Sequence, residues 1–271
     1  MIRRKGDGWW RKSKKKINQP IKYVVLTHYH GDHSWGLMGF PQNVTAISHT
    51  HCAENFANNC EPELKETVEK WLPQQIRELQ QKLIQLKKEN NPGTKKEEDH
   101  LSKLKQRLED LKKGQLVYPT ITFTDKLTLR MGKETIELIY PGRAHTNGNV
   151  LVYMPDRKVM VMGDMLFYGY LPYIDWRAGS DTQNWIAWLE KLSPWQIDTV
   201  IPGHGEVAGK VAFKQQEQYL ADLRQRVKEA MTQGLSLEEM TKSINMTGYK
   251  DLKFFDFLAS NIEAVYHEMK E

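Results

Sequence analysis

The sequence predicts an α/β fold of layered sheets and helices, with a helical hairpin inserted between the first strands and the rest. Two observations lead to this prediction. Short runs rich in β-branched residues alternate with helical segments, and the stretch 121–162 holds several such runs in succession. The long charged segment 62–113 instead carries leucines at helical spacing. At 271 residues, the chain suits one large domain or one domain with an insertion.

The N-terminal segment, residues 1–20, is strongly basic. Residues 1–16 carry eight basic side chains and one acidic side chain, whereas the rest of the chain holds slightly more acids than bases. We therefore expect a solvated tail or helix at 1–20, and we expect no specific nucleic-acid partner for the body of the chain. No apolar run in the sequence approaches the ~20 residues of a membrane-spanning helix.

The composition of this N-terminal segment also bears on location. No apolar run follows its basic residues, so it does not have the pattern of a signal peptide. As written, the sequence predicts a cytoplasmic protein. Secretion or export to the periplasm stays open if the native N-terminus is longer.

Short apolar runs predict strands that end at candidate functional loops. The first run, 21–27, leads into Gly31, and the second covers 44–47. Further strands are expected at 121–123, 127–129, 135–139, 150–154, 159–162 and 198–201. A helix is expected at 181–192, and helices follow over 211–271, with a capping box at 236–239.

The charged segment 62–113 predicts an antiparallel helical hairpin. Two leucine-rich seams, each with spacings of 3, 4 and 3, flank the breaker Asn90-Asn91-Pro92-Gly93. The seams consist of Ile76, Leu79, Leu83 and Leu86, and of Leu101, Leu104, Leu108 and Leu111. Charges of both signs fit a solvated exterior better than a nucleic-acid surface. We interpret this hairpin as an insertion.

The densest functional signal follows the first predicted strand. Three imidazoles and one carboxylate stand within six residues, at His28, His30, Asp32 and His33. Side chains two positions apart in extended chain point the same way, so His28 and His30 can hold one metal ion. A turn at Gly31 lets Asp32 and His33 face a second ion from the loop.

Three further candidates stand at the ends of later strands. His145 lies in the loop 142–149, Asp164 follows Gly163, and His204 lies in the sequence Pro202-Gly203-His204-Gly205. A single histidine or aspartate at a strand end is usually a cap or turn residue. Their order behind the first motif makes them a set, because loops at strand ends commonly carry function.

This series of motifs resembles the metallo-β-lactamase superfamily of metallohydrolases over about residues 21–210. The resemblance implies an αββα sandwich, with the metals at one edge of the two sheets, over residues 21–271. That domain would include the insertion 62–113 and the C-terminal helices 211–271. The resemblance assigns His28, His30 and His145 to a first ion, and Asp32, His33 and His204 to a second. Asp164 would bridge the two.

The resemblance also implies strands before the first motif. Only 27 residues precede His28, and most of them are too basic to form such strands, so we expect either that the native chain begins further upstream or that the first sheet is incomplete. An uncovered sheet edge favours pairing with another copy, which leaves a homodimer open.

The implied activity is hydrolysis by a dinuclear zinc centre. Two ions would share a hydroxide, because metal binding lowers the pKa of water from ~15.7 towards ~7. That hydroxide would attack an ester, thioester, lactone or similar small molecule, with Asp32 as the catalytic residue that orients it. Imidazole and carboxylate ligands also suit iron or manganese.

Three alternatives stay open. The first is a β-lactam hydrolase of the same fold, against which the bridging carboxylate of Asp164 argues, because such enzymes generally lack it. The second is a mononuclear iron sulfur dioxygenase, which would use a subset of the ligands. The third is a protein that binds a partner through the hairpin and keeps only a vestigial metal site.

The positions of several other residues indicate their roles. An aromatic cluster could line the substrate pocket; its members are Tyr168, Tyr170, Tyr173, Trp176 and Trp185. His49 and His51 repeat the His-x-His spacing without the following Asp-His, so we place them beside the site or at the surface. The two cysteines, Cys52 and Cys60, have no metal-ligand spacing and are expected to be buried thiols.

Overall fold

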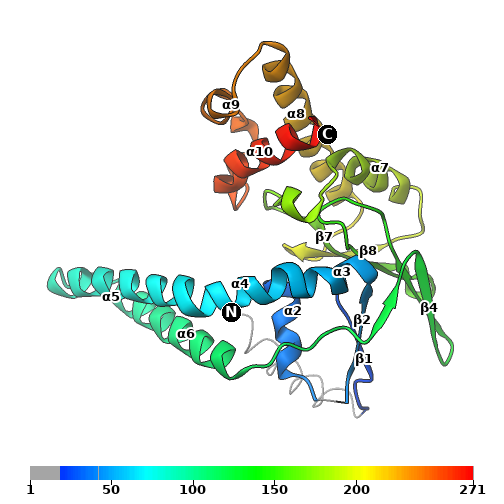
Figure 1. The fold of residues 1–271 in the computed structure, drawn as a ribbon, viewed down its shortest axis with the longest axis horizontal. Coiled ribbons are helices and arrows are strands. Elements are labelled where there is room, and N and C mark those ends of the chain that lie inside the picture. Colours follow the sequence, from blue (N-terminus) through cyan, green and yellow to red (C-terminus); the bar gives the residue numbers. More distant parts are fainter. Residues whose placement is uncertain (1–18, 42, 271) are drawn as a thin grey trace. The chain divides into compact units, whose positions relative to one another are not determined.

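The computed structural model describes residues 19–41 and 43–270 (Figure 1). The chain divides into two compact units, of which unit 1 comprises 1–47 and 53–121 and unit 2 comprises 48–52 and 122–271. Almost all of the predicted basic segment 1–20 lies outside the described residues. Among the described helices, none combines the length and the apolar character that a membrane crossing requires.

Unit 1 contains β1 and most of β2, the first two strands of a short sheet with strand order β1-β2-β3. β1 (Tyr23–Val25) runs parallel to β2 (Thr45–His49), so that Val25 stands opposite Ile47, and β3 (Ile121–Phe123) is the third strand. The predicted strand 21–27 shortens to β1 because only its central residues pair with β2 along a regular register.

A turn of helix follows β1 and sets the position of the first motif. α2 (Gly31–Ser34) leads into the 3₁₀ segment η1 (Trp35–Gly39). A Cβ on Gly31 would lie 2.3 Å from the Trp35 ring, so only glycine permits this packing. The Ser34 hydroxyl donates to the Tyr29 carbonyl at 2.9 Å and ties the turn back to the preceding segment.

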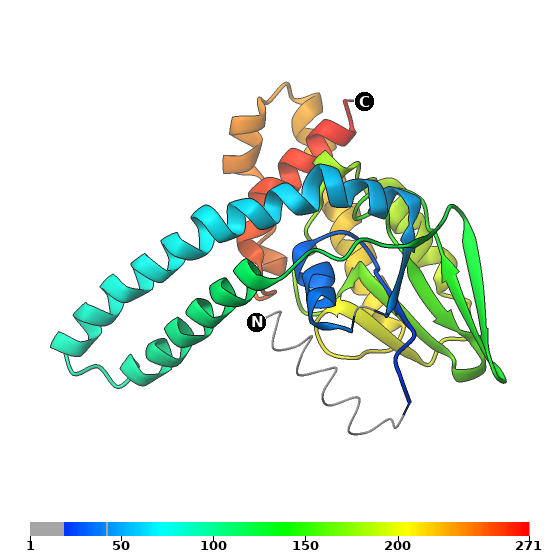
Figure 2. The same cartoon turned by 60° about the horizontal axis from the view of Figure 1, so that its bottom comes forward.

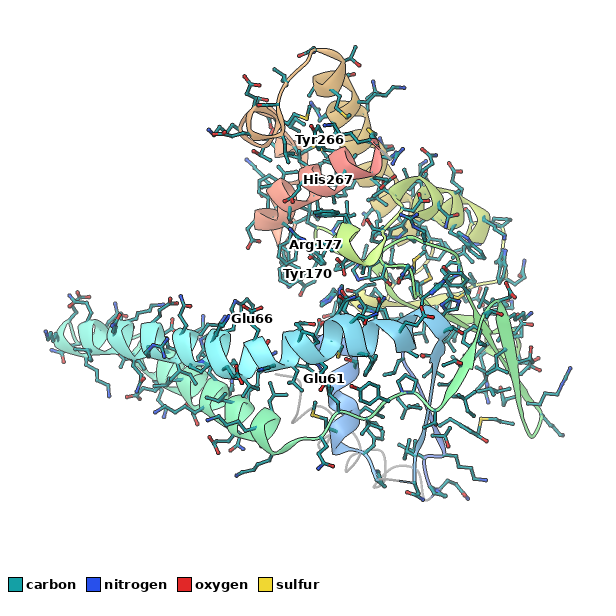
Figure 3. The ribbon with its side chains drawn as sticks, in the orientation of Figure 1. Glu61, Glu66, Tyr170, Arg177, Tyr266 and His267 are labelled. Atoms are coloured by element: carbon teal, nitrogen blue, oxygen red, sulfur yellow. The ribbon has the colours of Figure 1, made fainter. Side chains whose placement is uncertain are left out.

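The rest of unit 1 is a run of helix that ends in a hairpin. After α3 (Thr50–Asn55), which begins in unit 2, come η2 (Phe56–Cys60), α4 (Glu61–Glu66) and η3 (Thr67–Trp71). α5 (Leu72–Lys88) and α6 (Thr94–Lys113) then run side by side (Figures 1 and 2). Figure 3 labels Glu61 and Glu66, which begin and end α4.

The hairpin contact is made by the two predicted seams. Ile76, Leu79 and Leu83 of α5 are buried, as are Leu104 and Leu111 of α6. The breaker forms the turn, where Asn90 has a φ of 48° and Asn91 accepts a hydrogen bond from the Gly93 amide at 2.8 Å. It stays a prediction that residues 62–113 are an insertion within a single domain, 21–271.

Unit 2 is built on a five-stranded sheet with strand order β4-β5-β6-β7-β8. The strands are β4 (Lys126–Met131), β5 (Glu134–Ile139), β6 (Leu151–Met154), β7 (Val159–Phe167) and β8 (Thr199–His204). Neighbours are antiparallel except for β7 and β8, which are parallel. The 3₁₀ turn η4 (Pro155–Arg157) joins β6 to β7.

Four helices of unit 2 complete its core. They are α7 (Thr182–Leu192), α8 (Val211–Thr232), α9 (Leu237–Ser243) and α10 (Leu258–Glu268). Asp181 caps α7 by accepting a hydrogen bond from the Asn184 amide, and the capping box of Ser236 and Glu239 is present at α9. Trp185 and Phe213 are fully enclosed in this core.

Short 3₁₀ segments connect the remaining elements of unit 2. They are η5 (Trp176–Ala178), η6 (Thr247–Tyr249) and η7 (Phe255–Phe257). Figure 3 labels Arg177 in η5, and Tyr266 and His267 in α10. η7 immediately precedes α10 and carries part of an aromatic surface described below.

Candidate metal centre

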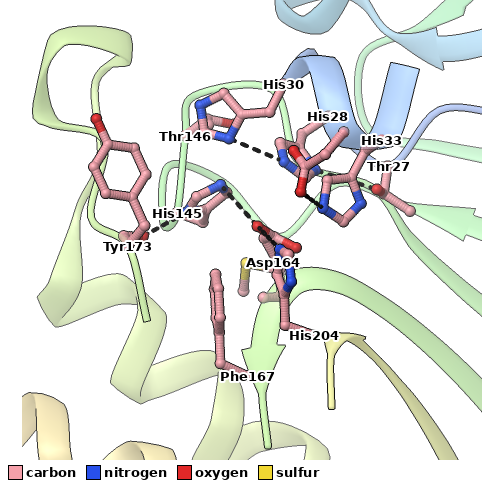
Figure 4. Close-up of polar contacts among 12 residues, drawn as sticks. Thr27, His28, His30, His33, His145, Thr146, Asp164, Phe167, Tyr173 and His204 are labelled. Carbon is pink, nitrogen blue, oxygen red and sulfur yellow. Dashed lines mark hydrogen bonds and ion pairs between the residues drawn. The ribbon is translucent and has the colours of Figure 1, made fainter. Parts of the chain in front are cut away.

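The first donor group lies in unit 1, where the chain leaves β1. His28 is buried at 1% exposure, and its Nε2 lies 3.1 Å from Nδ1 of His30 (Figure 4). The two rings meet edge to face at 4.8 Å. The two nitrogens are close enough to bind one cation, and the sequence predicts that role from the His-x-His spacing.

Asp32 and His33 complete the first donor group. His33 Nε2 lies 3.3 Å from Asp32 Oδ2, and the His33 ring is 4.4 Å from that of His28. Both residues stand in α2 rather than in the loop that the sequence predicts. The helix begins this early because the amides of His33 and Ser34 both donate to the His30 carbonyl at 3.0 Å.

The first group is supported by its own neighbours in sequence. Thr27 Oγ1 lies 3.2 Å from Nδ1 of His28, on the side of the ring away from His30. A hydrogen bond at one ring nitrogen sets the tautomer and orientation of the other, which is how proteins hold metal-ligating histidines.

The second donor group, His145, Asp164 and His204, lies in unit 2. Asp164 is on β7 and His204 ends β8, the parallel neighbour of β7. His145 comes from the loop between β5 and β6. Nε2 of His145 and Nε2 of His204 lie 3.6 and 3.4 Å from the same oxygen, Oδ2 of Asp164 (Figure 4).

A glycine allows the close approach of β8 to Asp164. A Cβ on Gly203 would lie 1.9 Å from Asp164 Oδ1 and 2.7 Å from the carbonyl carbon of Gly163. No side chain fits in that space, so the sequence Pro202-Gly203-His204 has a physical reason. The predicted strand 159–162 also lengthens to β7, because β8 pairs with it as far as Phe167.

His145 is oriented by a backbone carbonyl. Its Nδ1 lies 2.8 Å from the carbonyl oxygen of Tyr173, and a carbonyl only accepts hydrogen bonds. Nδ1 therefore donates to that carbonyl, and Nε2 is the ring nitrogen that faces Asp164. The ring is 0% exposed and its loop is closed by bonds between Asn149 and Thr146, so the arrangement is rigid.

The donor chemistry of each group fits a metal ion. Within unit 1, the donor atoms of His28 and His30, and those of Asp32 and His33, lie within 4.8 Å of one another. The same limit holds in unit 2 for His145 and Asp164. Imidazole nitrogen with carboxylate oxygen is a ligand set that Zn²⁺ favours.

Four of the five predicted pocket aromatics, all except Trp185, are half-buried against the core of unit 2. The Tyr170 ring lies 6.0 Å from His204 and the Tyr173 ring 6.3 Å from His145. Tyr168 contributes its amide, which donates to the His204 carbonyl at 2.9 Å. Trp176 stacks on His267 at 4.2 Å, and Trp185 is fully buried, so these two rings pack within unit 2.

His49 and His51, which repeat the His-x-His spacing, lie in unit 2, and His49 packs against other residues of that unit. His49 stacks on Tyr140 at 3.7 Å, and its Nε2 lies 2.8 Å from the Thr124 carbonyl. Both cysteines are buried thiols that form no disulfide, as the sequence predicts. Burial raises the pKa of Cys60 to about 11, although its hydrogen bonds with Ser34 and Trp35 act in the opposite direction.

Three residues near the donor groups were missed by sequence reasoning. Phe167 stacks on His204 at 5.0 Å, and Phe254 meets the same ring edge to face at 5.8 Å. Phe167 could have been found three positions after Asp164, whereas nothing in the sequence marks Phe254. In unit 1, burial lowers the pKa of Arg107 while the charge of Asp32 raises it.

Curated proteins similar to this chain include named hydrolases. Acyl-coenzyme A thioesterase MBLAC2 of Bos taurus is 26% identical over 191 residues, which cover 69% of this chain and 57% of that protein. Linear primary-alkylsulfatase of Pseudomonas sp. (strain ATCC 19151) is 21% identical over 248 residues, covering 86% and 44% respectively. The chain thus spans about half the length of these relatives.

Solved structures confirm the predicted fold class. The sec-alkylsulfatase Pisa1 from Pseudomonas sp. matches 94% of this chain and 42% of its own, with a TM-score of 0.60 and 16% identity. A metallo-beta-lactamase from Pontibacter korlensis matches 79% of this chain and 76% of its own, with a TM-score of 0.53 and 18% identity.

The family profile described as the metallo-beta-lactamase superfamily matches residues 4–204. That range holds every residue of both donor groups and ends at His204. The resemblance drawn from the motifs is therefore confirmed, and this chain belongs to the metallo-beta-lactamase superfamily.

Proposed function

We propose that this protein is a dinuclear zinc-dependent hydrolase of a small ester, thioester or lactone. Membership of the superfamily supports the proposal, because the matched range includes both donor groups. The names of the relatives, a thioesterase and an alkylsulfatase among them, support hydrolysis as the reaction.

The observation that carries the proposal is the environment of Asp164. One carboxylate oxygen, at 4% residue exposure, faces two imidazole nitrogens at 3.4 and 3.6 Å. Those separations exceed a good hydrogen bond but suit three ligands arranged around cations. A buried carboxylate is costly unless it is paired or binds a metal, which favours a site made for cations.

The chain's own residues would divide the work as follows. His28, His30 and His145 would hold one ion; Asp32, His33 and His204 would hold the other; and Asp164 would bridge them. When bound, two zinc ions would lower the pKa of water and polarise the substrate oxygen. Iron or manganese would fit the same donor types.

Asp32 is the residue to which we assign proton handling. Its side chain is 43% exposed, the largest exposure among the acids of the two groups, and His33 lies 3.3 Å away. An accessible carboxylate beside an imidazole can orient the attacking water and pass a proton to the leaving group. We place the half-buried Tyr168, Tyr170 and Tyr173 in the substrate pocket, and Trp176 at its margin.

A sulfate ester is a second candidate substrate that the sequence reasoning did not consider. The alkylsulfatase match covers 86% of this chain, more than the thioesterase match does. The β-lactam, iron dioxygenase and partner-binding alternatives stay open as proposals of lower rank. A cytoplasmic location and a homodimer also stay predictions.

A hydrolysis panel on zinc-loaded protein tests the proposal. The substrates are an aryl ester, an acyl thioester, an acyl lactone, a cephalosporin and an alkyl sulfate. We expect turnover of at least one of the first three, and Asp164→Asn should lower its kcat/KM by roughly 100-fold or more, because the ligand charge is lost.

The matched control is His100→Ala, which removes an exposed histidine of the hairpin whose side chain is 57% exposed. This variant should keep the parent rate. Equal rates for Asp164→Asn and the parent would reject the assignment of Asp164, and turnover of the alkyl sulfate alone would favour the second candidate.

A further inference from the structure

We propose that an aromatic surface of unit 2 binds the apolar chain of the substrate beside His204 and selects long-chain over short-chain esters. The aromatic surface consists of Tyr170, Tyr173, Phe254 and Phe257. The reaction named here rests on the proposed function, whereas binding of the chain itself does not. Phe254 is the residue to which we assign the selectivity.

The four rings form a continuous surface that starts at His204. Tyr170 and Phe254 lie 6.0 and 5.8 Å from the His204 ring and 5.0 Å from each other. Phe257 extends the surface, at 5.1 Å from Phe254 and 5.5 Å from Tyr173. The tilted arrangements leave ring faces and edges for an apolar chain to contact.

The surface is only partly covered by the protein. Phe254 is 37% exposed, one of the few large hydrophobic side chains of unit 2 that face solvent to this degree. Tyr170, Tyr173 and Phe257 are half-buried around it. Ligand pockets are typically lined by apolar and aromatic side chains beside a few polar groups, and here His204 is such a polar group.

Phe254 holds its place at a conformational cost. Its φ of 63° and ψ of 28° lie in the left-handed region, which a bulky side chain rarely adopts and glycine adopts freely. Strained residues of this kind concentrate at binding sites, where the surrounding structure holds them. A ring kept at such a position indicates that the ring itself is used.

The neighbouring backbone supplies the restraint. The Leu171 amide donates to the Lys253 carbonyl at 2.8 Å, and the Lys253 amide donates to the Gly169 carbonyl at 3.2 Å. The Lys253 ammonium also donates to Tyr170 Oη at 3.1 Å and lies over the Tyr170 ring. Tyr170 is labelled in Figure 3. Tyr170 and Phe254 are therefore fixed to one another through residue 253.

The position of the surface predicts which substrates benefit. An acetyl group at a reacting centre that includes His204 has no methylenes to reach rings whose centroids begin about 6 Å away. An octanoyl chain has six methylenes, and each one buried adds to binding by roughly 0.8 kcal/mol, or about fourfold. The substrate class is therefore an ester-type molecule with an apolar acyl or alkyl chain.

The experiment compares p-nitrophenyl octanoate with p-nitrophenyl acetate on the zinc-loaded full chain. The parent should prefer octanoate in kcat/KM. Phe254→Ala and Phe254→Gly should each reduce that preference by about 15-fold, which corresponds to two methylenes losing contact. Phe254→Tyr should keep it, since the ring is retained.

Phe254→Gly distinguishes the effect of losing the ring from the effect of the left-handed backbone conformation. Glycine accepts the left-handed conformation, so this variant should unfold at a temperature no lower than that of Phe254→Ala while showing the same loss of preference. The matched control is Met131→Ala, which removes an exposed apolar side chain of β4 in the same unit and should leave the preference unchanged.

Binding of octanoate to metal-free protein, measured by calorimetry, tests the aromatic surface even if no ester is hydrolysed. Weaker binding by Phe254→Ala but not by Met131→Ala supports the proposal, and an absence of turnover then counts only against the proposed function. The proposal is overturned if the parent hydrolyses both esters without preferring p-nitrophenyl octanoate, or if Phe254→Ala keeps the preference of the parent. It is also overturned if the parent does not bind octanoate, or if Phe254→Ala binds octanoate as well as the parent does.

Discussion

The two donor groups are assembled by the chain in different ways. His28, His30, Asp32 and His33 stand within six residues, whereas His145, Asp164 and His204 are spread over 60 positions. The first group depends on one turn of helix after β1, and the second depends on the pairing of β7 with β8 and on a loop. The first group can therefore be predicted from local spacing, and the second only from the order of its members in the sequence.

The supports of the two groups differ in the same way. Thr27, next to His28 in the chain, contacts that ring at 3.2 Å. His145 is oriented by the carbonyl of Tyr173, which is 28 positions away, and Asp164 has room only because residue 203 is glycine. A substitution that disturbs the second group should accordingly do more harm than a local one in the first.

Among the residues that support the donors, the largest effect is expected from Gly203→Ala. Its new Cβ would meet Asp164 Oδ1 at 1.9 Å, so β8 or the carboxylate must shift. Zinc affinity and kcat/KM should fall by about 100-fold, the upper end of the range for residues that support metal ligands. Equilibrium dialysis with zinc and the ester assay measure both.

Gly209→Ala is the control for this change. A Cβ there would have no heavy atom within 4 Å, so zinc affinity and rate should stay at the parent values. If Gly203→Ala behaves like Gly209→Ala, the second donor group does not depend on the close approach of β8.

A smaller effect is expected from Thr27→Val, which removes the hydroxyl beside His28 and keeps the shape of the side chain. Loss of the contact at Nδ1 frees the tautomer and orientation of the ring, so zinc affinity should fall by about tenfold. Thr232→Val, at the end of α8, is the control. A loss as large as that in Gly203→Ala would remove the difference between the two groups.

The last prediction concerns the packing beside the first group rather than zinc affinity. Burial raises the pKa of Cys60 from 9.0 to about 11, so its folded-state pKa lies above the unfolded value. The stabilisation this gives is complete below about pH 9 and is lost as the pH rises towards 11. In a Cys52→Ala variant, thiol labelling at pH 8 should be about 100-fold slower in native than in denatured protein.

Equal labelling rates would show that the Cys60 thiol is accessible, and the packing around Trp35 and Ser34 described here would then be wrong. A labelling rate in native protein that rises steeply between pH 9 and 11 would support the raised pKa.

Much of the fold follows from local patterns. The helix predicted at 181–192 begins one residue later, after the cap Asp181, because that carboxylate accepts the Asn184 amide. The leucine seams predict α5 and α6, since each needs only helical spacing and a breaker between them. The superfamily resemblance is likewise carried by short motifs.

Other features could not be predicted because they depend on distant partners. α2 replaces the expected loop, since the packing of Gly31 on Trp35 outweighs the weak helix propensity of Gly-Asp-His. β7 extends to Phe167 only because β8, over 30 residues later, continues beside it. Phe254 contacts His204 across 50 positions, in a conformation that no sequence pattern marks.

The zinc content of the purified full chain tests the central claim most directly. After equilibrium dialysis against zinc and gel filtration, elemental analysis should find two zinc ions per chain, because seven donors in two groups fit a dinuclear centre. Asp164→Asn should retain fewer. A parent chain that holds no zinc under these conditions, or one iron per chain with oxygen uptake, would contradict the account.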